Sequence, residues 1–125
     1  MTQKILIVDD EPHIRALMEQ TLEDLEDEGV ELLTAGDGQQ ALDLIRRECP
    51  QLVFLDVMMP KMNGYEVCAA VKQDSNLRNI YIIMLTAKGQ EIDKQKGENM
   101  GADIYMTKPF DPDEILQKSQ QILGL

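Results

Sequence analysis

The sequence predicts an α/β fold, in which a parallel sheet carries helices on both faces. Short apolar runs rich in β-branched residues alternate with amphipathic stretches of helical spacing along the chain. The apolar runs show little alternation with polar residues, which is typical of strands buried on both faces. Strands that alternate with helices are joined by right-handed crossovers, so they are expected to run parallel.

Five segments are expected to form the strands. They are residues 5–8, 30–35, 52–55, 80–85 and 104–106. Apolar residues recur at helical spacing over residues 14–25, 41–45, 67–71 and 115–123, which predicts four helices. The last helix is expected to begin after Asp111, an N-cap acid followed by a proline and, three residues after the cap, by Glu114.

Residues 91–100 are expected to form a further and looser helix. Gly97 lies in its interior and charged residues occupy most other positions, so little apolar surface is available for packing. No repeat or linker-like segment interrupts the alternation of strands and helices. Residues 1–125 are therefore expected to form one domain.

Composition and charge exclude several classes of function. The chain has 125 residues, 43% hydrophobic and 28% charged, as in ordinary globular domains. Its formal net charge of −11 disfavours nucleic acid and anionic membranes and favours a metal ion or a basic protein partner. Nothing resembles a signal peptide or a membrane span, so the protein is expected to be cytoplasmic.

Several residues that could bind metals or react are expected to have structural roles. Cys49 and Cys68 lack metal-ligand spacing and are expected to be free thiols in the core. His13, in the first turn of a helix, is expected to face solvent. The sequence Gly-Asp-Gly at 36–38 is expected to be a turn, because it lacks the lysine of a phosphate loop. The methionines are expected to fill gaps in the core rather than bind copper, among them Met58, Met59, Met62, Met84, Met100 and Met106.

Polar residues follow the apolar runs where the predicted strands end. Asp9 and Asp10 follow the first strand, Asp56 the third, Thr86 the fourth and Lys108 the fifth. In open α/β sheets, ligands bind beyond the carboxyl ends of the strands. A single aspartate after a strand is usually a turn or N-cap residue, but three converging carboxylates repel one another and need a counter-charge.

Magnesium is the expected counter-charge, because it prefers carboxylate oxygens and accepts a phosphate oxygen as a further ligand. Lys108 adds a second cation, and the Thr86 hydroxyl adds a hydrogen-bond donor for a phosphoryl group. With Asp56 as a carboxylate nucleophile, these groups predict a site of phosphoryl transfer.

Five sequence blocks resemble the receiver domain of two-component response regulators. The blocks are ILIVDDEP, TAGDGQQAL, VFLDVMMPKMNG, IIMLTAKG and GADIYMTKPF, and their order and spacing agree with the family over nearly the whole chain. The resemblance implies a doubly wound, flavodoxin-like parallel sheet of five strands in the order 2-1-3-4-5, with helices on both faces. It also implies a phosphorylation-controlled binding module rather than an enzyme.

The resemblance implies a phosphoacceptor and a metal site. Asp56 would accept a phosphoryl group from a histidine kinase or phosphotransfer protein. Asp9, Asp10 and Asp56 would hold Mg²⁺ together with the backbone carbonyl of Met58.

The resemblance also implies a route from the site to the surface. Lys108 would contact the phosphoryl group, and the Lys108–Pro109 peptide bond would be cis, which proline makes inexpensive. Thr86 and Tyr105 would pass the change to a surface formed by residues 91–100, the fifth strand and the last helix. That surface would control a downstream protein or a fused output domain, without direct contact with nucleic acid or membrane.

Two side chains beyond the family pattern are expected to prolong the phosphorylated state. Met58 and Lys88 lie two residues after Asp56 and Thr86 and would flank the approach of a hydrolytic water. Methionine orients water poorly, and a protonated lysine cannot act as a base. The alternative, that both side chains point into solvent and have little effect, stays open.

A magnesium-dependent phosphatase with Asp56 as nucleophile is the alternative function. Phosphatases of the haloacid dehalogenase type carry a second aspartate two residues after the nucleophile, where this chain has Met58. The chain also lacks a cap domain to enclose a substrate. The sequence leaves open the cognate kinase, the output partner, and whether this receiver stands alone or belongs to a longer chain.

Overall fold

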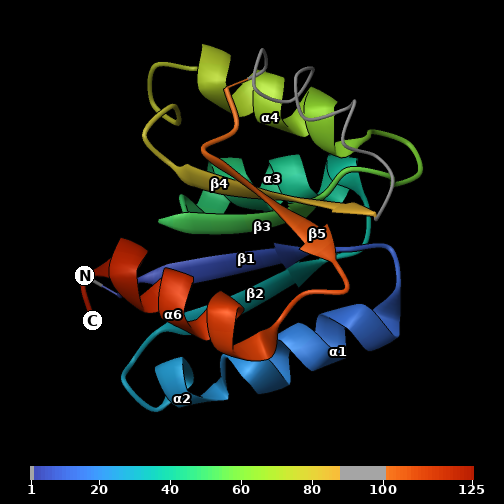
Figure 1. The fold of residues 1–125 in the computed structure, drawn as a ribbon. Helices are drawn as coiled ribbons and strands as arrows, with labels where there is room; N and C mark the ends of the chain where they lie inside the picture. Colours follow the sequence, from blue (N-terminus) through green and yellow to red (C-terminus); the bar gives the residue numbers. More distant parts are fainter. Residues whose placement is uncertain (1, 88–100) are drawn as a thin grey trace.

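A computed structural model gives the structure of residues 2–87 and 101–125. In this part of the chain, five parallel strands form one sheet in the order β2-β1-β3-β4-β5 (Figure 1). The strands are β1 (Lys4–Val8), β2 (Glu31–Ala35), β3 (Leu52–Asp56), β4 (Tyr81–Ala87) and β5 (Ile104–Lys108). The predicted fold class and strand order are confirmed.

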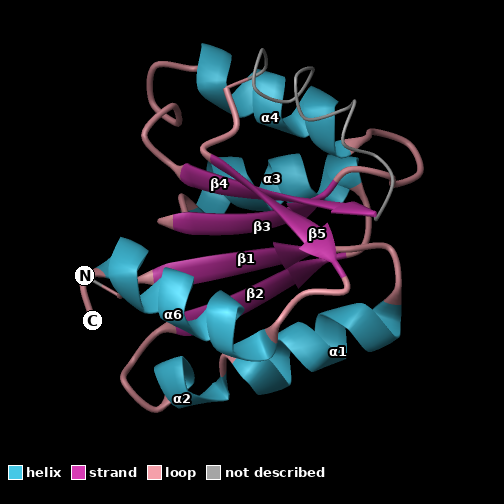
Figure 2. Cartoon of the chain, viewed as in Figure 1, coloured by secondary structure: helices cyan, strands magenta, loops and turns pink. Residues whose placement is uncertain are grey.

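Helices cover both faces of the sheet, as the secondary-structure colouring in Figure 2 makes clear. One face carries α1 (Pro12–Thr21), α2 (Glu23–Glu26) and α6 (Pro112–Leu123), and the other carries α3 (Gly38–Glu48) and α4 (Gly64–Gln73). As predicted, Asp111 caps α6, and its side chain accepts a hydrogen bond from the Asp113 amide at 2.9 Å. The helix predicted over residues 91–100 lies outside the described residues.

Successive side chains of each strand pack into two different cores. Leu6 and Val8 of β1 join the core beneath α3 and α4, whereas Ile5 and Ile7 join the core beneath α1 and α6. All four side chains are fully buried. Burial on both faces explains the unbroken apolar runs of β1 and β3, and each such side chain contributes about 1.5–3 kcal/mol of hydrophobic stabilisation.

The helix predicted over residues 14–25 is divided in the structure. The first helix, α1, ends at Thr21, and α2 begins at Glu23 after Leu22, whose ψ is 8°. The chain forms a 3₁₀ turn here, because the Leu25 amide donates a hydrogen bond to the Leu22 carbonyl, three residues earlier, at 2.9 Å. Leu22 and Leu25 nevertheless remain fully buried in one core. The apolar spacing therefore identified most of the buried face, although Leu17, one of the spaced residues, is 43% exposed. It did not predict the break.

The prediction that both cysteines are core thiols is right for Cys68 and wrong for Cys49. Both are free, Cys68 is buried, and Cys49 is exposed. Cys49 is the C-cap of α3 and has a φ of 47°, a left-handed conformation that ends the helix at the surface. The prediction for His13 is confirmed, since its side chain is exposed and pairs with Glu11 at 3.2 Å.

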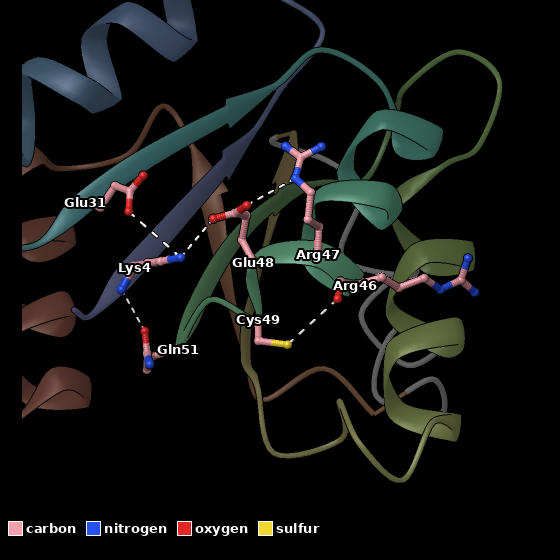
Figure 3. A network of polar contacts seen from close by, with 7 residues as sticks. All are labelled: Lys4, Glu31, Arg46, Arg47, Glu48, Cys49 and Gln51. Atoms are coloured by element: carbon pink, nitrogen blue, oxygen red, sulfur yellow. Dashed lines mark hydrogen bonds and ion pairs between the residues drawn. The ribbon is translucent and has the colours of Figure 1, made fainter. Parts of the chain in front are cut away.

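A polar network closes the amino-terminal edge of the sheet (Figure 3). The Lys4 ammonium lies 2.8 Å from a Glu48 carboxylate oxygen and 3.9 Å from one of Glu31, so it links β1 to β2 and α3. Arg47 also contacts Glu48, and the Lys4 amide donates to the Gln51 side chain at 2.7 Å. These residues lie at the opposite edge from the carboxyl ends of the strands.

Candidate functional site

Three aspartates converge at the carboxyl end of the sheet. Strands β1 and β3 are neighbours, and Val8 pairs with Leu55, so the residues that follow, Asp9 and Asp56, are adjacent. Asp9, Asp10 and Asp56 each present one carboxylate oxygen, and these oxygens lie within 4.8 Å of one another. Asp9 and Asp56 are buried, whereas Asp10 is exposed. The predicted acidic cluster therefore has two inner carboxylates and one that faces solvent.

Lys108 bridges the two buried carboxylates. Its ammonium lies 2.7 Å from an oxygen of Asp9 and 3.2 Å from an oxygen of Asp56. Lys108 is the last residue of β5, which is separated from β3 by β4 in the sheet. Charge-assisted hydrogen bonds of this length are among the stronger polar contacts in proteins. The lysine thus neutralises part of the charge of the cluster.

The environment makes the carboxylate form of Asp56 costly. Burial raises the pKa of Asp56 to about 6, the negative charges of Asp9 and Asp10 add to this effect, and Lys108 opposes it. Burial lowers the pKa of Lys108, but its hydrogen bond to Asp9 and the charges of Asp56 and Asp9 outweigh burial, so the pKa is raised overall. Lys108 is therefore charged at neutral pH, and an additional cation would stabilise ionised Asp56.

The polar residues at the ends of β4 and β5 complete this edge. Thr86 is buried and lies one residue beyond Leu85, the partner of Asp56 in the sheet. Tyr105 in β5 pairs with Met84, is half-buried against the core beneath α3 and α4, and has a buried hydroxyl oxygen. Asp56, Thr86 and Lys108 were predicted to follow their strands. In the structure they are instead the last or next-to-last residues of β3, β4 and β5, because strand pairing continues through them.

The loop over residues 57–63 follows Asp56 directly. Its first residue, Val57, is buried, and the Val57 amide donates to the Leu85 carbonyl at 3.2 Å. The next residue, Met58, is 62% exposed, so the prediction that this methionine fills a core gap is wrong. Met58 lies on a loop beyond the end of β3 and not in the sheet. Lys88, the other predicted modulator, lies outside the described residues. The Lys108–Pro109 peptide bond is cis, as predicted.

Sequence reasoning missed the residues that hold Asp9 in place. The Arg15 guanidinium donates to the Asp9 carbonyl at 2.6 Å, and the Glu11 amide donates to an Asp9 carboxylate oxygen at 3.0 Å. Arg15 lies in the first turns of α1, the helix that starts just after the aspartates. The only signal in the sequence is a basic residue six positions after Asp9. Because Arg15 contacts the backbone carbonyl of Asp9, no sequence pattern predicts this contact.

The cluster fits a hard divalent cation such as Mg²⁺. Three carboxylates and one ammonium leave two negative charges, which one divalent ion balances. Mg²⁺ prefers oxygen ligands in proteins, and it retains waters, for which the exposed side of Asp10 leaves access. The donor set therefore supports a metal site that is open to a phosphate oxygen.

Comparisons with known proteins agree with this arrangement. The sequence model for the response regulator receiver domain matches residues 5–120. The chain is 46% identical over 123 residues to the alkaline phosphatase synthesis transcriptional regulatory protein PhoP of Bacillus subtilis, a match that covers 98% of this chain and 49% of PhoP. It is 39% identical over 113 residues to protein PilG of Pseudomonas aeruginosa, which covers 90% of this chain and 82% of PilG.

The same likeness holds for a solved structure. The chemotaxis response regulator CheY4 of Vibrio cholerae superposes with a TM-score of 0.86 at 35% identity, over 98% of this chain and 99% of that chain. The chain spans about half the length of the transcriptional regulators that it matches. Along the described ranges, no helix has both the length and the apolar character needed to cross a membrane.

Proposed function

The chain belongs to the family of response regulator receiver domains, and on this basis we propose that it is a switch controlled by phosphorylation of Asp56. The observation that carries the proposal is the buried Asp56 carboxylate, 3.2 Å from the Lys108 ammonium and clustered with Asp9 and Asp10. We propose that residues 1–125 act as one receiver domain in the cytoplasm. The phosphoryl donor is a histidine kinase or a phosphotransfer protein.

In the proposed reaction, a carboxylate oxygen of Asp56 attacks the phosphorus of a phosphohistidine. The new bond joins this oxygen to phosphorus, while the bond from phosphorus to the donor nitrogen breaks and the nitrogen keeps the electron pair. Asp9, Asp10, Asp56 and the Met58 carbonyl would hold Mg²⁺, which supplies positive charge to the phosphoryl oxygens when bound. Asp56 is buried, so the acyl phosphate would form on a carboxyl group that has little contact with bulk water.

Lys108 and Thr86 are the proposed partners of the transferred group. The Lys108 ammonium already contacts Asp56, so a short movement would bring it onto a phosphoryl oxygen. The Thr86 hydroxyl would donate to a second phosphoryl oxygen, and the movement of Thr86 would be coupled to Tyr105. The proposed output surface comprises β5, α6 and residues 91–100, because Lys108 and Tyr105 both lie on β5.

The proposed partner at this surface is a downstream protein or a fused output domain. Relatives named transcriptional regulators are about twice the length of this chain, which is consistent with an output domain in those proteins. For the receiver itself we propose no direct contact with nucleic acid or membrane, because its net charge of −11 repels both.

Phosphorylation by acetyl phosphate and Mg²⁺ tests the proposal. Wild type should incorporate one phosphoryl group per chain, detected by intact mass, and Asp56→Asn should abolish incorporation. Asp10→Ala should greatly slow it, because the phosphoryl charge would then face the remaining acids with weaker metal binding. Asp27→Asn, which removes an exposed acid on another part of the surface, is the matched control and should label like wild type.

The same protein preparations distinguish the switch from the phosphatase. A binding module should release about one p-nitrophenol from p-nitrophenyl phosphate for each phosphoryl group that Asp56 takes up. Sustained release that depends on Asp56 would favour the phosphatase instead. Position 58 argues against that outcome, because the exposed Met58 has no group able to serve as a general acid.

A further inference from the structure

The first residue of α3 lies against the loop over residues 57–63. Gly38 is buried, and a Cβ atom at this position would overlap the carbonyl oxygen of Met62. The same atom would lie 2.6 Å from the Met62 carbonyl carbon and 2.7 Å from its Cβ. Because the contact is mostly with backbone, no side-chain rotation could relieve it. Only glycine allows α3 and this loop to approach so closely.

A neighbouring ion pair connects the same two segments. Asp37 caps α3, with its carboxylate accepting from the Gln40 amide at 2.8 Å, and a carboxylate oxygen lies 3.6 Å from the Lys61 ammonium. Lys61 has a φ of 68°, a left-handed backbone conformation that is uncommon outside glycine. The turn before α3 therefore meets the loop at two consecutive positions, Lys61 and Met62.

The two ends of the loop are fixed independently of α3. Val57 is bonded to β4, and the Gly64 amide donates to the Val57 carbonyl at 2.9 Å. Asn63 and Glu66 form a reciprocal capping box at the start of α4. Residues 58–62 span the interval between these fixed ends, and Met58, whose carbonyl is the proposed metal ligand, lies within it. The contact with Gly38 is thus the place where a third element limits the position of this interval.

We infer that Gly38 is a positioning residue for the metal and phosphoryl site. Because glycine has no side chain, the Met62 carbonyl can lie against Gly38. We expect this contact to hold the loop in the position from which the Met58 carbonyl could bind the metal. This inference rests on the proposed function, because it assumes that the loop supplies a ligand to Mg²⁺. Gly38 acts through Met62 and touches neither Asp56 nor the phosphoryl group.

Magnesium affinity without any phosphoryl donor tests this role. Isothermal titration of MgCl₂ into Gly38→Ala should give a dissociation constant about tenfold or more above that of wild type, as for other residues that orient metal ligands. Gln39→Ala is the matched control, because it changes the next residue of α3 at an exposed position and adds no atom towards the loop. Its affinity should equal that of wild type.

Thermal unfolding in the presence of EDTA separates positioning from a general loss of structure. A folded Gly38→Ala protein that binds Mg²⁺ as wild type does would overturn the inference and leave the proposed function intact. Wild type that fails to bind Mg²⁺ would overturn both.

If Gly38→Ala does not fold, a Mg²⁺ titration of wild type followed by amide chemical shifts supplies the test. The amides of Gly38 and Gln39 should shift with the same midpoint as that of Met62, because the contact joins them. Shifts confined to the aspartates and residues 57–59, with none at Gly38 or Met62, would overturn the inference.

Discussion

Asp56 shows how a residue of the proposed site can lower the stability of the fold that holds it. Its pKa is raised to about 6 in the folded protein, first by burial and then by Asp9 and Asp10. An acid with a raised pKa binds its proton more tightly in the folded than in the unfolded state. Below the unfolded pKa near 4, Asp56 is protonated in both states and does not lower the free energy of unfolding. Above pH 6 it is ionised in both states, and the full loss of folding stability is present.

Asp56→Asn should accordingly stabilise the unphosphorylated protein at neutral pH. We expect the free energy of unfolding to rise by about 1–2 kcal/mol at pH 7.5, less than the whole pKa shift implies because solvent screens part of the site. The gain should fall towards zero between pH 6 and pH 4. Urea unfolding in EDTA at several pH values measures it, with Asp27→Asn as the control. A variant less stable than wild type at pH 7.5 would contradict this account.

Met58 provides a second prediction at the scale of one side chain. Its side chain is exposed two residues after the proposed phosphoacceptor, and a thioether orients water poorly, so Met58→Asn combined with Lys88→Glu should speed loss of the phosphoryl group. We expect about a tenfold increase, equivalent to a barrier lower by ~1.4 kcal/mol. The measurement is the decay of phosphorylated protein after removal of the donor, and Met58→Leu is the apolar control. An unchanged decay would place the control of water access at other residues.

At the scale of elements, Lys72 ties α4 to the starts of β4 and β5. Its ammonium donates to the carbonyls of Arg78 and Ile80 at 3.0 and 2.6 Å and to the Asp103 carboxylate at 3.0 Å. The same Asp103 oxygen accepts from the Ile82 amide at 2.8 Å. One lysine thus uses its three donors to connect a helix to the segments that precede two strands.

Lys72→Met should therefore destabilise the fold although it preserves most of the side-chain volume. We expect the free energy of unfolding to fall by about 1–3 kcal/mol, because two carbonyls and a carboxylate lose their shared donor. Chemical denaturation at pH 7.5 measures the change. Arg46→Met, which removes an exposed cation from α3, should have little effect. Equal stability of the two variants would show that water replaces the lysine at this junction.

The elements also show which features of the fold a sequence reveals. The strands were predictable because burial on both faces leaves an unbroken apolar signal, as in Leu52 to Leu55. The break at Leu22 was not, because it arises from one local hydrogen bond while the apolar spacing continues across it. The exposure of Cys49 depends on a left-handed residue at the end of a helix, which cysteine does not signal.

At the scale of the whole molecule, the sheet assembles the site from distant parts of the chain. Asp9 directly follows β1, whereas Asp56 and Lys108 end β3 and β5. Their convergence was predictable because parallel strands end at one edge. The Arg15 contact and the closeness of Gly38 to Met62 were not predictable, because both involve backbone carbonyls. Side-chain chemistry can be read from a sequence, whereas close backbone approaches depend on the final packing.

We propose that the strand that carries Lys108 is also the route by which phosphorylation of Asp56 would reach a distant surface. A phosphoryl group adds nearly two negative charges at Asp56, which should draw Lys108 and the Thr86 hydroxyl towards it. Tyr105 lies on the same strand as Lys108, and Met106 packs in one core with Ile115 of α6. A shift of β5 would therefore change the packing of the core beneath α1 and α6 and the position of the surface residues of β5.

Amide chemical shifts on addition of beryllofluoride, which mimics the phosphoryl group, test this propagation. Shifts should be large in β5 and α6, and also over residues 91–100. They should be small at Leu42 and Ile45, because these residues pack on the opposite face of the sheet from α6. Asp56→Asn treated in the same way is the control and should show no shifts. Uniform shifts, or none beyond the acidic cluster, would mean that phosphorylation has only a local charge effect.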